Sequence, residues 1–147
     1  MLAARYLFIV FFILAMLPAN VAADIVVVVN AENEIDTLTK RQVIDLYMGR
    51  NAYFPDGTRT LRFDQPSDST VRADFYHHLT QMKLPSINAY WARLIFTGRS
   101  SAPVPLSGDQ EMLEVIENNK YAIGYLNKGS VNNRVKVVFE LNSNEIE

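Results

Sequence analysis

The stretch "DIVVVVN" (residues 24–30) indicates the fold class, because it is a continuous apolar run that does not alternate with polar residues. β-branched side chains favour the extended conformation. A strand without a polar face is buried on both sides, as the inner strands of helix-covered sheets are. We therefore predict an α/β fold in which this segment is an inner strand of a central β-sheet flanked by helices.

The residues before this strand have the features of a secretory signal peptide. Arg5 precedes an unbroken apolar run at 6–17, and small residues at 21–23 provide a cleavage site. The run is shorter than the about 20 residues of an ordinary membrane span. We expect a signal peptide at 1–23, cleaved after Ala23, and a single periplasmic domain at 24–147 with no stable membrane insertion. An uncleaved N-terminal anchor is the alternative.

The rest of the chain alternates between helical and extended patterns. Helices are predicted over 38–50, 70–82, 84–99 and 107–119, and further strands over 60–64, 121–127 and 134–140. The expected order is strand, helix, strand, three helices, then two strands. The residues 142–147 are expected to be a frayed tail.

Several local signals predict how these elements begin and which side chains they bury. Thr39 with Gln42 forms a capping box, Ser86 can cap a helix, and Ser107 with Gln110 is a second possible capping box. The expected apolar faces are Val43, Ile44, Tyr47 and Met48; Val71, Phe75, Leu79 and Met82; Ile87, Trp91, Leu94 and Ile95; and Met112, Leu113, Val115 and Ile116. In the last strand, one face is expected to hold Val135, Val137 and Phe139.

The composition argues against several classes of function. A net charge of −2 argues against nucleic acid and anionic membranes as partners, and the absence of cysteine rules out disulfides and thiol chemistry. His77 and His78 are adjacent, so on a helix they point about 100° apart and cannot share a metal. No catalytic motif is present, so we predict a protein that is not an enzyme, with no catalytic residue, no metal and no cofactor.

Three segments resemble, in the right order, the phosphate-binding proteins of ABC importers, which have the type 2 periplasmic-binding fold. "LTKRQVIDLYMGR" (38–50) is similar to a helix of that family that ends in a Phe- or Tyr-x-Gly turn. "RFDQPSDSTVRADFY" (62–76) is similar to its phosphate loop, Arg-x-Asp-x-Ser-Gly-Thr, and "VIENNKYAIGYLN" (115–127) to its Asn-x-x-Ala-Ile-Gly-Tyr strand entry. The resemblance implies one lobe of this two-lobed fold, a periplasmic location and solute binding for ABC uptake or sensing.

The second of these segments carries the candidate binding site. A helix N-terminus attracts oxyanions, and nearby hydroxyl and guanidinium groups strengthen the attraction. The candidate ligands of phosphate or a similar oxyanion are Arg62, Asp64, Ser67, Ser69, Thr70 and Arg72. By the resemblance, Asp64 accepts the proton of monoprotonated phosphate. Residues 65–68 lengthen the loop, and the glycine of the family's Ser-Gly-Thr motif is absent. Ser69 with Thr70, or Ser67 with Thr70, would take the place of that motif.

Two alternatives remain open from the sequence. In the first, the same residues only build a helix end, with Asp68 or Ser69 as the cap and Arg72 paired with Asp68. In the second, a single lobe exposes the cleft face that meets the other lobe in the family. That face would then dock on a membrane sensor, a porin or another envelope protein. For solute binding, a dimer of the chain would replace the missing lobe.

Overall fold

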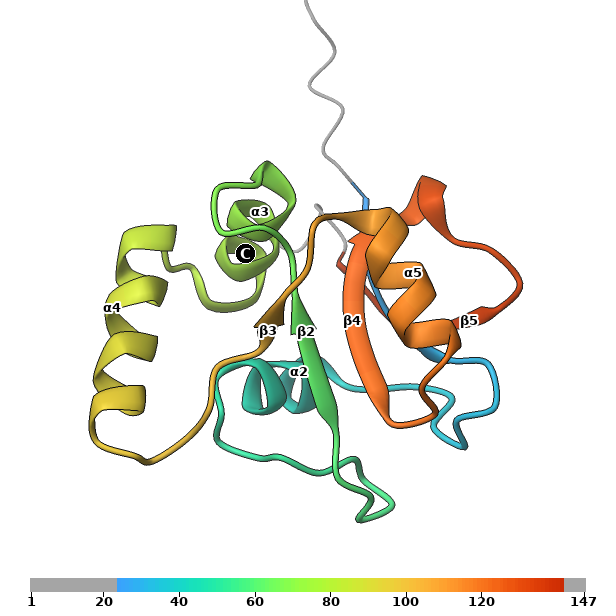
Figure 1. The fold of residues 1–147 in the computed structure, drawn as a ribbon, viewed down its shortest axis with the longest axis horizontal. Helices are drawn as coiled ribbons and strands as arrows, with labels where there is room; N and C mark the ends of the chain where they lie inside the picture. Colours follow the sequence, from blue (N-terminus) through green and yellow to red (C-terminus); the bar gives the residue numbers. More distant parts are fainter. Residues whose placement is uncertain (1–23, 142–147) are drawn as a thin grey trace, which may run out of the picture.

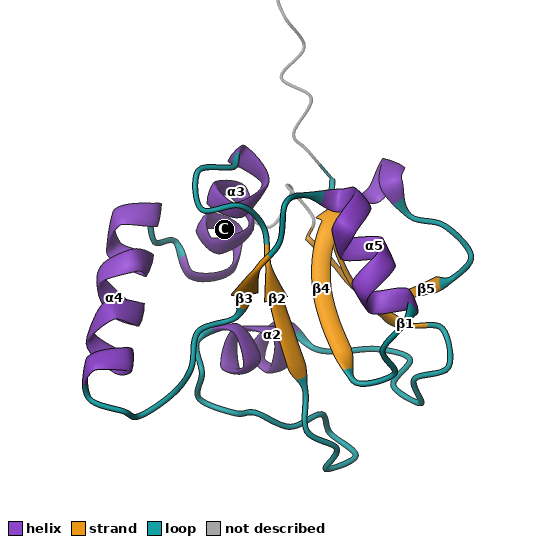
Figure 2. Ribbon diagram, in the orientation of Figure 1, coloured by secondary structure: helices purple, strands orange, loops and turns teal. Residues whose placement is uncertain are grey.

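The computed structural model describes residues 24–141, so the predicted signal peptide and C-terminal tail lie outside the described residues. Figures 1 and 2 show one sheet with helices on both faces. The elements are β1 (Ile25–Asn30), α2 (Lys40–Tyr47), β2 (Leu61–Asp64), α3 (Thr70–Thr80), α4 (Leu84–Phe96), β3 (Val104–Pro105), α5 (Asp109–Glu117), β4 (Ala122–Asn127), the 3₁₀ turn η2 (Lys128–Ser130) and β5 (Val135–Leu141).

The sheet has the strand order β3-β2-β4-β1-β5. β2 runs parallel to β3 and β4, whereas β1 runs antiparallel to β4 and β5. Every residue of β1 is buried, which confirms the prediction that this apolar run is an inner strand. The predicted α/β fold class is also confirmed.

Two apolar clusters cover the two faces of the sheet, and β1 contributes to both because its side chains alternate. Val26 and Val28 face α5, where they meet Met112 and Ile116. On the other face, the core contains aliphatic and aromatic side chains of α2, α3 and α4, among them Tyr47, Phe75, Ile87 and Trp91. Figure 1 shows α4 farthest from the strands, beside α3.

The glycine of the "AIGY" motif has a packing role between β4 and α5. A Cβ atom at Gly124 would overlap the Met112 sulfur atom and lie 3.2 Å from Ile116 Cδ1. The absence of a side chain therefore allows α5 to lie directly on β4.

The predicted helix starts are correct for α2 and α3 and wrong for α4 and α5. The Thr39–Gln42 capping box is present, and the Ser69 side chain caps α3. The N-cap of α4 is Lys83, because Pro85 already occupies the first turn, where a missing N–H costs nothing. At α5 the N-cap is Gly108, and the Ser107 N–H instead donates to the Glu111 carboxylate.

Two predicted apolar faces also need correction. Ile95 is 55% exposed, because α4 packs at the margin of the domain and buries only Ile87 and Trp91. In β5 the pairing shifts by one residue, so that Val27 faces Phe139 while Val28 faces Val137. Such a bulge breaks the alternation of side chains. Phe139 therefore packs in the cluster opposite to Val135 and Val137.

The proline-rich connection contains a strand that the sequence analysis did not predict. β3 pairs parallel with β2 through Val104 and Pro105. A proline lacks the N–H that an inner strand needs, which is compatible with the edge position of β3. The helix predicted over 107–119 therefore does not directly follow the helix before it, because β3 lies between them.

Candidate oxyanion site at the start of α3

The candidate site lies where β2 ends and α3 begins. Residues 65–69 connect the two elements, and Figure 1 shows the N-termini of α3 and α5 near the same end of β2. Because β2, β3 and β4 are parallel to one another, their carboxyl ends meet at this edge of the sheet. In open α/β sheets this is the edge where ligands bind.

Asp64 is the last residue of β2 and is only 5% exposed. Its Oδ2 accepts hydrogen bonds from Arg72 Nε at 3.0 Å and the Tyr76 hydroxyl at 3.2 Å. Its Oδ1 accepts from the Gln65 backbone N–H at 2.9 Å and from the Tyr125 hydroxyl. The carboxylate is therefore satisfied by four donors within the protein, as a buried charge must be.

Arg72 is a buried side chain, although it belongs to the first turn of α3. It is 7% exposed and pairs with Asp64, so the expected pair with Asp68 is not formed. Its Nη1 also donates to Asn88 Oδ1 at 3.0 Å and to the Ser67 carbonyl at 3.4 Å. Burial alone would lower the pKa of Arg72, but the Asp64 carboxylate outweighs this effect and raises it.

One hydroxyl group of the candidate site has a structural role, and the other two belong to exposed residues. Ser69 Oγ accepts the Arg72 backbone N–H at 3.1 Å and thereby caps α3. Ser67 and Thr70 are exposed, as is the Asp68 carboxylate. Since the first N–H groups of a helix have no partner within it, those of Thr70 and Val71 have to be satisfied by solvent or by a ligand.

Arg62 lies on the same face of β2 as Asp64, but its guanidinium contacts other elements. Nη1 donates to the Leu46 carbonyl at 2.7 Å and Nη2 to the Ser101 carbonyl at 2.9 Å. Leu46 is in the last turn of α2, so the positive charge lies at the negative end of that helix dipole. Of the six candidate residues, the structure thus groups the other five around the start of α3.

Sequence analysis missed several residues that hold this region together. Tyr76 and Tyr125 both donate to Asp64, and Gln65 Nε2 donates to Asp109 Oδ1 at 2.8 Å. Asp109 Oδ2 also accepts from Asn127 Nδ2 at 2.9 Å and from the Ser130 hydroxyl at 2.8 Å. Asp109 thereby ties the start of α5 to the ends of β2 and β4. Gln65 and Tyr76 lie within the family-like segment 62–76, and Tyr125 lies within the segment 115–127. Their place in these segments was the only sequence signal for these contacts.

The N–H and hydroxyl groups at the start of α3 are hydrogen-bond donors, which could bind an anion. Among residues 24–141, no group of three or more His, Cys, Asp or Glu side chains could hold a metal ion. Within the same residues, no helix has the length and apolarity needed to cross a membrane.

Solved structures that resemble this chain include phosphate-transport proteins. An ABC-type phosphate transport receptor from Vibrio cholerae superposes with a TM-score of 0.63 at 17% identity, covering 79% of this chain and 45% of the receptor. A phosphate ABC transporter substrate-binding protein with bound phosphate, from Clostridium perfringens, gives a TM-score of 0.64 at 18% identity, covering 82% and 46%. For PstS from Borrelia burgdorferi the values are 0.55, 11%, 79% and 46%.

These likenesses establish the fold, and they confirm the resemblance found in the sequence. The chain spans less than half the length of each of these structures. No protein-family model matches the sequence, and neither does any curated protein.

Proposed function

We propose that this chain, which has the fold of part of the phosphate ABC transporter substrate-binding proteins, is a periplasmic solute-binding domain for phosphate or a similar oxyanion. The observation that carries the proposal is the exposed N-terminus of α3 beside the carboxyl end of β2, in a fold that resembles a phosphate-bound structure. The role is one of binding rather than catalysis, in ABC uptake or sensing.

The ligand would be held mainly by neutral donors. The free N–H groups at the start of α3 and the hydroxyls of Ser67 and Thr70 would donate to the oxyanion, and the helix dipole would add to the attraction. The charge of Arg72 is balanced by Asp64, so the buried pair supports the loop without adding net positive charge. In this arrangement Arg72 acts through the Ser67 carbonyl, which its Nη1 contacts.

The exposed Asp68 favours a ligand that carries a proton. A carboxylate beside an oxyanion repels a fully ionised ligand but accepts a hydrogen bond from a protonated one. Asp64 was expected in this role by the resemblance, but its oxygen atoms already accept four internal hydrogen bonds. We therefore assign proton acceptance to Asp68, and we expect phosphate to bind more tightly than sulfate at neutral pH.

Replacing Thr70 by proline tests this site without breaking the helix. Thr70 is the first residue of α3, where proline is tolerated, and the substitution removes both its N–H and its hydroxyl. Ser69 has φ −74° and ψ 144°, a conformation that a following proline permits. In calorimetric titrations of the purified protein with phosphate, Thr70→Pro should weaken binding by about tenfold or more, equivalent to about 1.4 kcal/mol.

Lys40→Pro is the matched control, since Lys40 is the first residue of α2 and follows Thr39 at φ −77° and ψ 157°. This variant should bind phosphate as the wild type does. If the wild type releases no heat at millimolar phosphate, or if Thr70→Pro binds normally, the oxyanion proposal is wrong.

A second candidate function is an interaction module that docks on an envelope protein or on another copy of the chain. Two observations favour it. Asp64 and Arg72 are buried and satisfy each other, and large apolar side chains are exposed, with Phe96 92% and Val104 54% accessible. Affinity capture from envelope extracts with the wild type and with Phe96→Ser distinguishes the two candidate functions. A partner that the wild type captures and the variant loses would favour the interaction module, provided that the wild type does not bind phosphate.

A further inference from the structure

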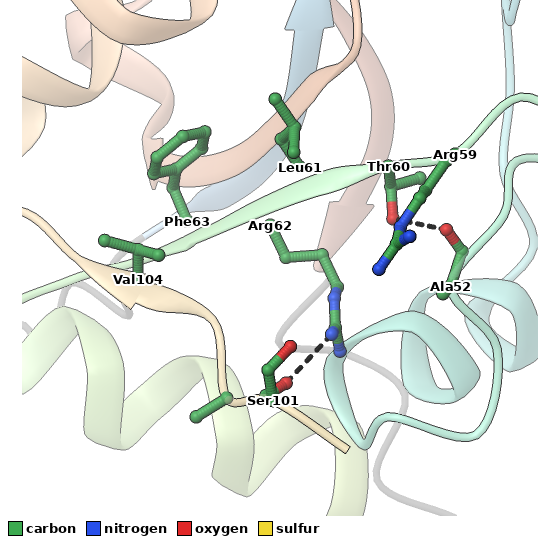
Figure 3. A pocket seen from close by; sticks show the side chains of 9 residues that line it. Ala52, Arg59, Thr60, Leu61, Arg62, Phe63, Ser101 and Val104 are labelled. Carbon is green, nitrogen blue, oxygen red and sulfur yellow. Dashed lines mark hydrogen bonds between the residues drawn. The ribbon is translucent and has the colours of Figure 1, made fainter.

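A pocket at the β2–β3 edge of the sheet lies apart from the start of α3. It has a volume of about 210 Å³ and is lined by residues 59–63, which include the start of β2, together with Ala52, Ser101, Ala102 and Val104. Figure 3 shows Arg59 and Arg62 extending to the same side of the strand, whereas Leu61 and Phe63 project to the other side.

The two arginines bring positive charge to this pocket without a balancing carboxylate. Among the ion pairs formed within residues 24–141, none includes Arg59 or Arg62. Burial lowers the pKa of Arg62, and the nearby charge of Arg59 also lowers it. Like charges placed together repel each other, and an anion between them would remove that repulsion.

The Arg62 guanidinium is already held in position. Two of its N–H groups donate to the Leu46 and Ser101 carbonyls, and its Cζ lies 6.0 Å from the centre of the Trp91 ring. A guanidinium has five N–H donors, so within residues 24–141 three donors of Arg62 have no hydrogen-bond partner and could bind another acceptor. A preorganised arginine loses less conformational entropy when it binds an oxyanion.

The remaining lining restricts what the pocket can bind. Ser101 borders it, and the Thr60 hydroxyl donates to the Ala52 carbonyl at 3.0 Å. Figure 3 shows the Arg62–Ser101 and Thr60–Ala52 hydrogen bonds on the polar side of the strand. The volume of about 210 Å³ is below the about 300–1,000 Å³ of typical small-molecule pockets. A small ion therefore fits better than a larger organic ligand.

We propose that the Arg59–Arg62 pocket binds a small oxyanion such as sulfate or phosphate, at a site separate from the start of α3. Arg62 contributes fixed donors, and the exposed Arg59 closes over the anion from solvent. The site goes beyond the proposed function, because none of the residues at the start of α3 lines it. The two sites can therefore be present or absent independently of each other.

Titration of the isotope-labelled protein with sulfate, followed by backbone amide NMR, tests the proposal. The amide signals of residues 59–63 and 101–102 should shift and saturate. Arg59→Glu should weaken this binding by about tenfold or more, since it reverses the charge of a side chain that makes no ion pair with residues 24–141. Arg41→Glu is the control, because it makes the same charge change at an exposed position of α2.

The outcomes separate this site from the site at α3. Saturable shifts at 59–63 that persist in Thr70→Pro and Arg41→Glu but are lost in Arg59→Glu would support the pocket. Shifts that do not saturate, or that weaken equally in Arg59→Glu and Arg41→Glu, would overturn it, because they would reflect general attraction by net charge. Saturable shifts confined to residues 67–71 would also overturn it and would leave the α3 site standing.

Discussion

Replacing Arg72 by methionine would leave the Asp64 carboxylate buried without its cation. The two side chains are 8% and 6% exposed and lie 3.0 Å apart. Removing one partner of a buried ion pair destabilises a protein by about 3–5 kcal/mol. Asp64 keeps the hydroxyl donors of Tyr76 and Tyr125, so we expect a loss of about 3 kcal/mol, at the lower end of that range.

Urea unfolding measures this loss through a convenient probe. Trp91 is the only tryptophan of the chain and is 4% exposed, so its fluorescence should report the unfolding of the core. With a denaturant dependence of about 2 kcal/mol per molar urea, a loss of about 3 kcal/mol lowers the midpoint by about 1.5 M. Such a loss is a large part of the about 5–15 kcal/mol that stabilises a typical domain.

An exposed ion pair provides the control. Arg134 Nη1 lies 2.7 Å from Glu117 Oε1, closer than the buried pair, but the Arg134 side chain is 64% exposed. Solvent screens such pairs, so Arg134→Met should leave the midpoint almost unchanged. In the double variant Asp64→Asn with Arg72→Met, the charge is removed on both sides and part of the stability should return. If Arg72→Met lowers the midpoint no more than Arg134→Met, the pair does not fasten α3 to β2.

Two further predictions concern a glycine and the buried tyrosines. Gly49 and Gly98 have φ of 68° and 67°, but only at Gly49 would a Cβ meet other atoms, Ser100 Oγ and Trp91 Cη2, both at 2.7 Å. Gly49→Ala should therefore lower the melting temperature more than Gly98→Ala, and equal losses would contradict the close packing. Burial raises the pKa of three tyrosines well above the ordinary value of 10.0: Tyr47, Tyr76 and Tyr125. The folded state then keeps protons that the unfolded state loses, so stability is complete below about pH 10 and falls above it, by up to about 1.4 kcal/mol per pH unit for each tyrosine. Urea midpoints at about pH 8 and about pH 11 measure this fall, and a constant midpoint would contradict it.

The sequence by itself determined the features that depend on neighbouring residues. The unbroken run of β1 predicted an inner strand, because a segment with no polar face has to be buried on both sides. The Thr39–Gln42 capping box and the Ser69 cap were recognised for the same kind of reason, since each bond joins residues three positions apart. The fold resemblance followed from such local motifs in their order along the chain.

Only the tertiary structure decided which partners the buried polar side chains have. Arg72 has a carboxylate four residues before it, yet it bonds to Asp64, because the end of β2 and the first turn of α3 pack against each other. Tyr125 reaches Asp64 across 61 residues of sequence, and Arg62 turns to Leu46 and Ser101 rather than to the start of α3. Spacing in the sequence limits which side chains share a face. The choice among possible partners, however, depends on how separate elements pack, because a buried charge has to bond to the groups that this packing brings within reach.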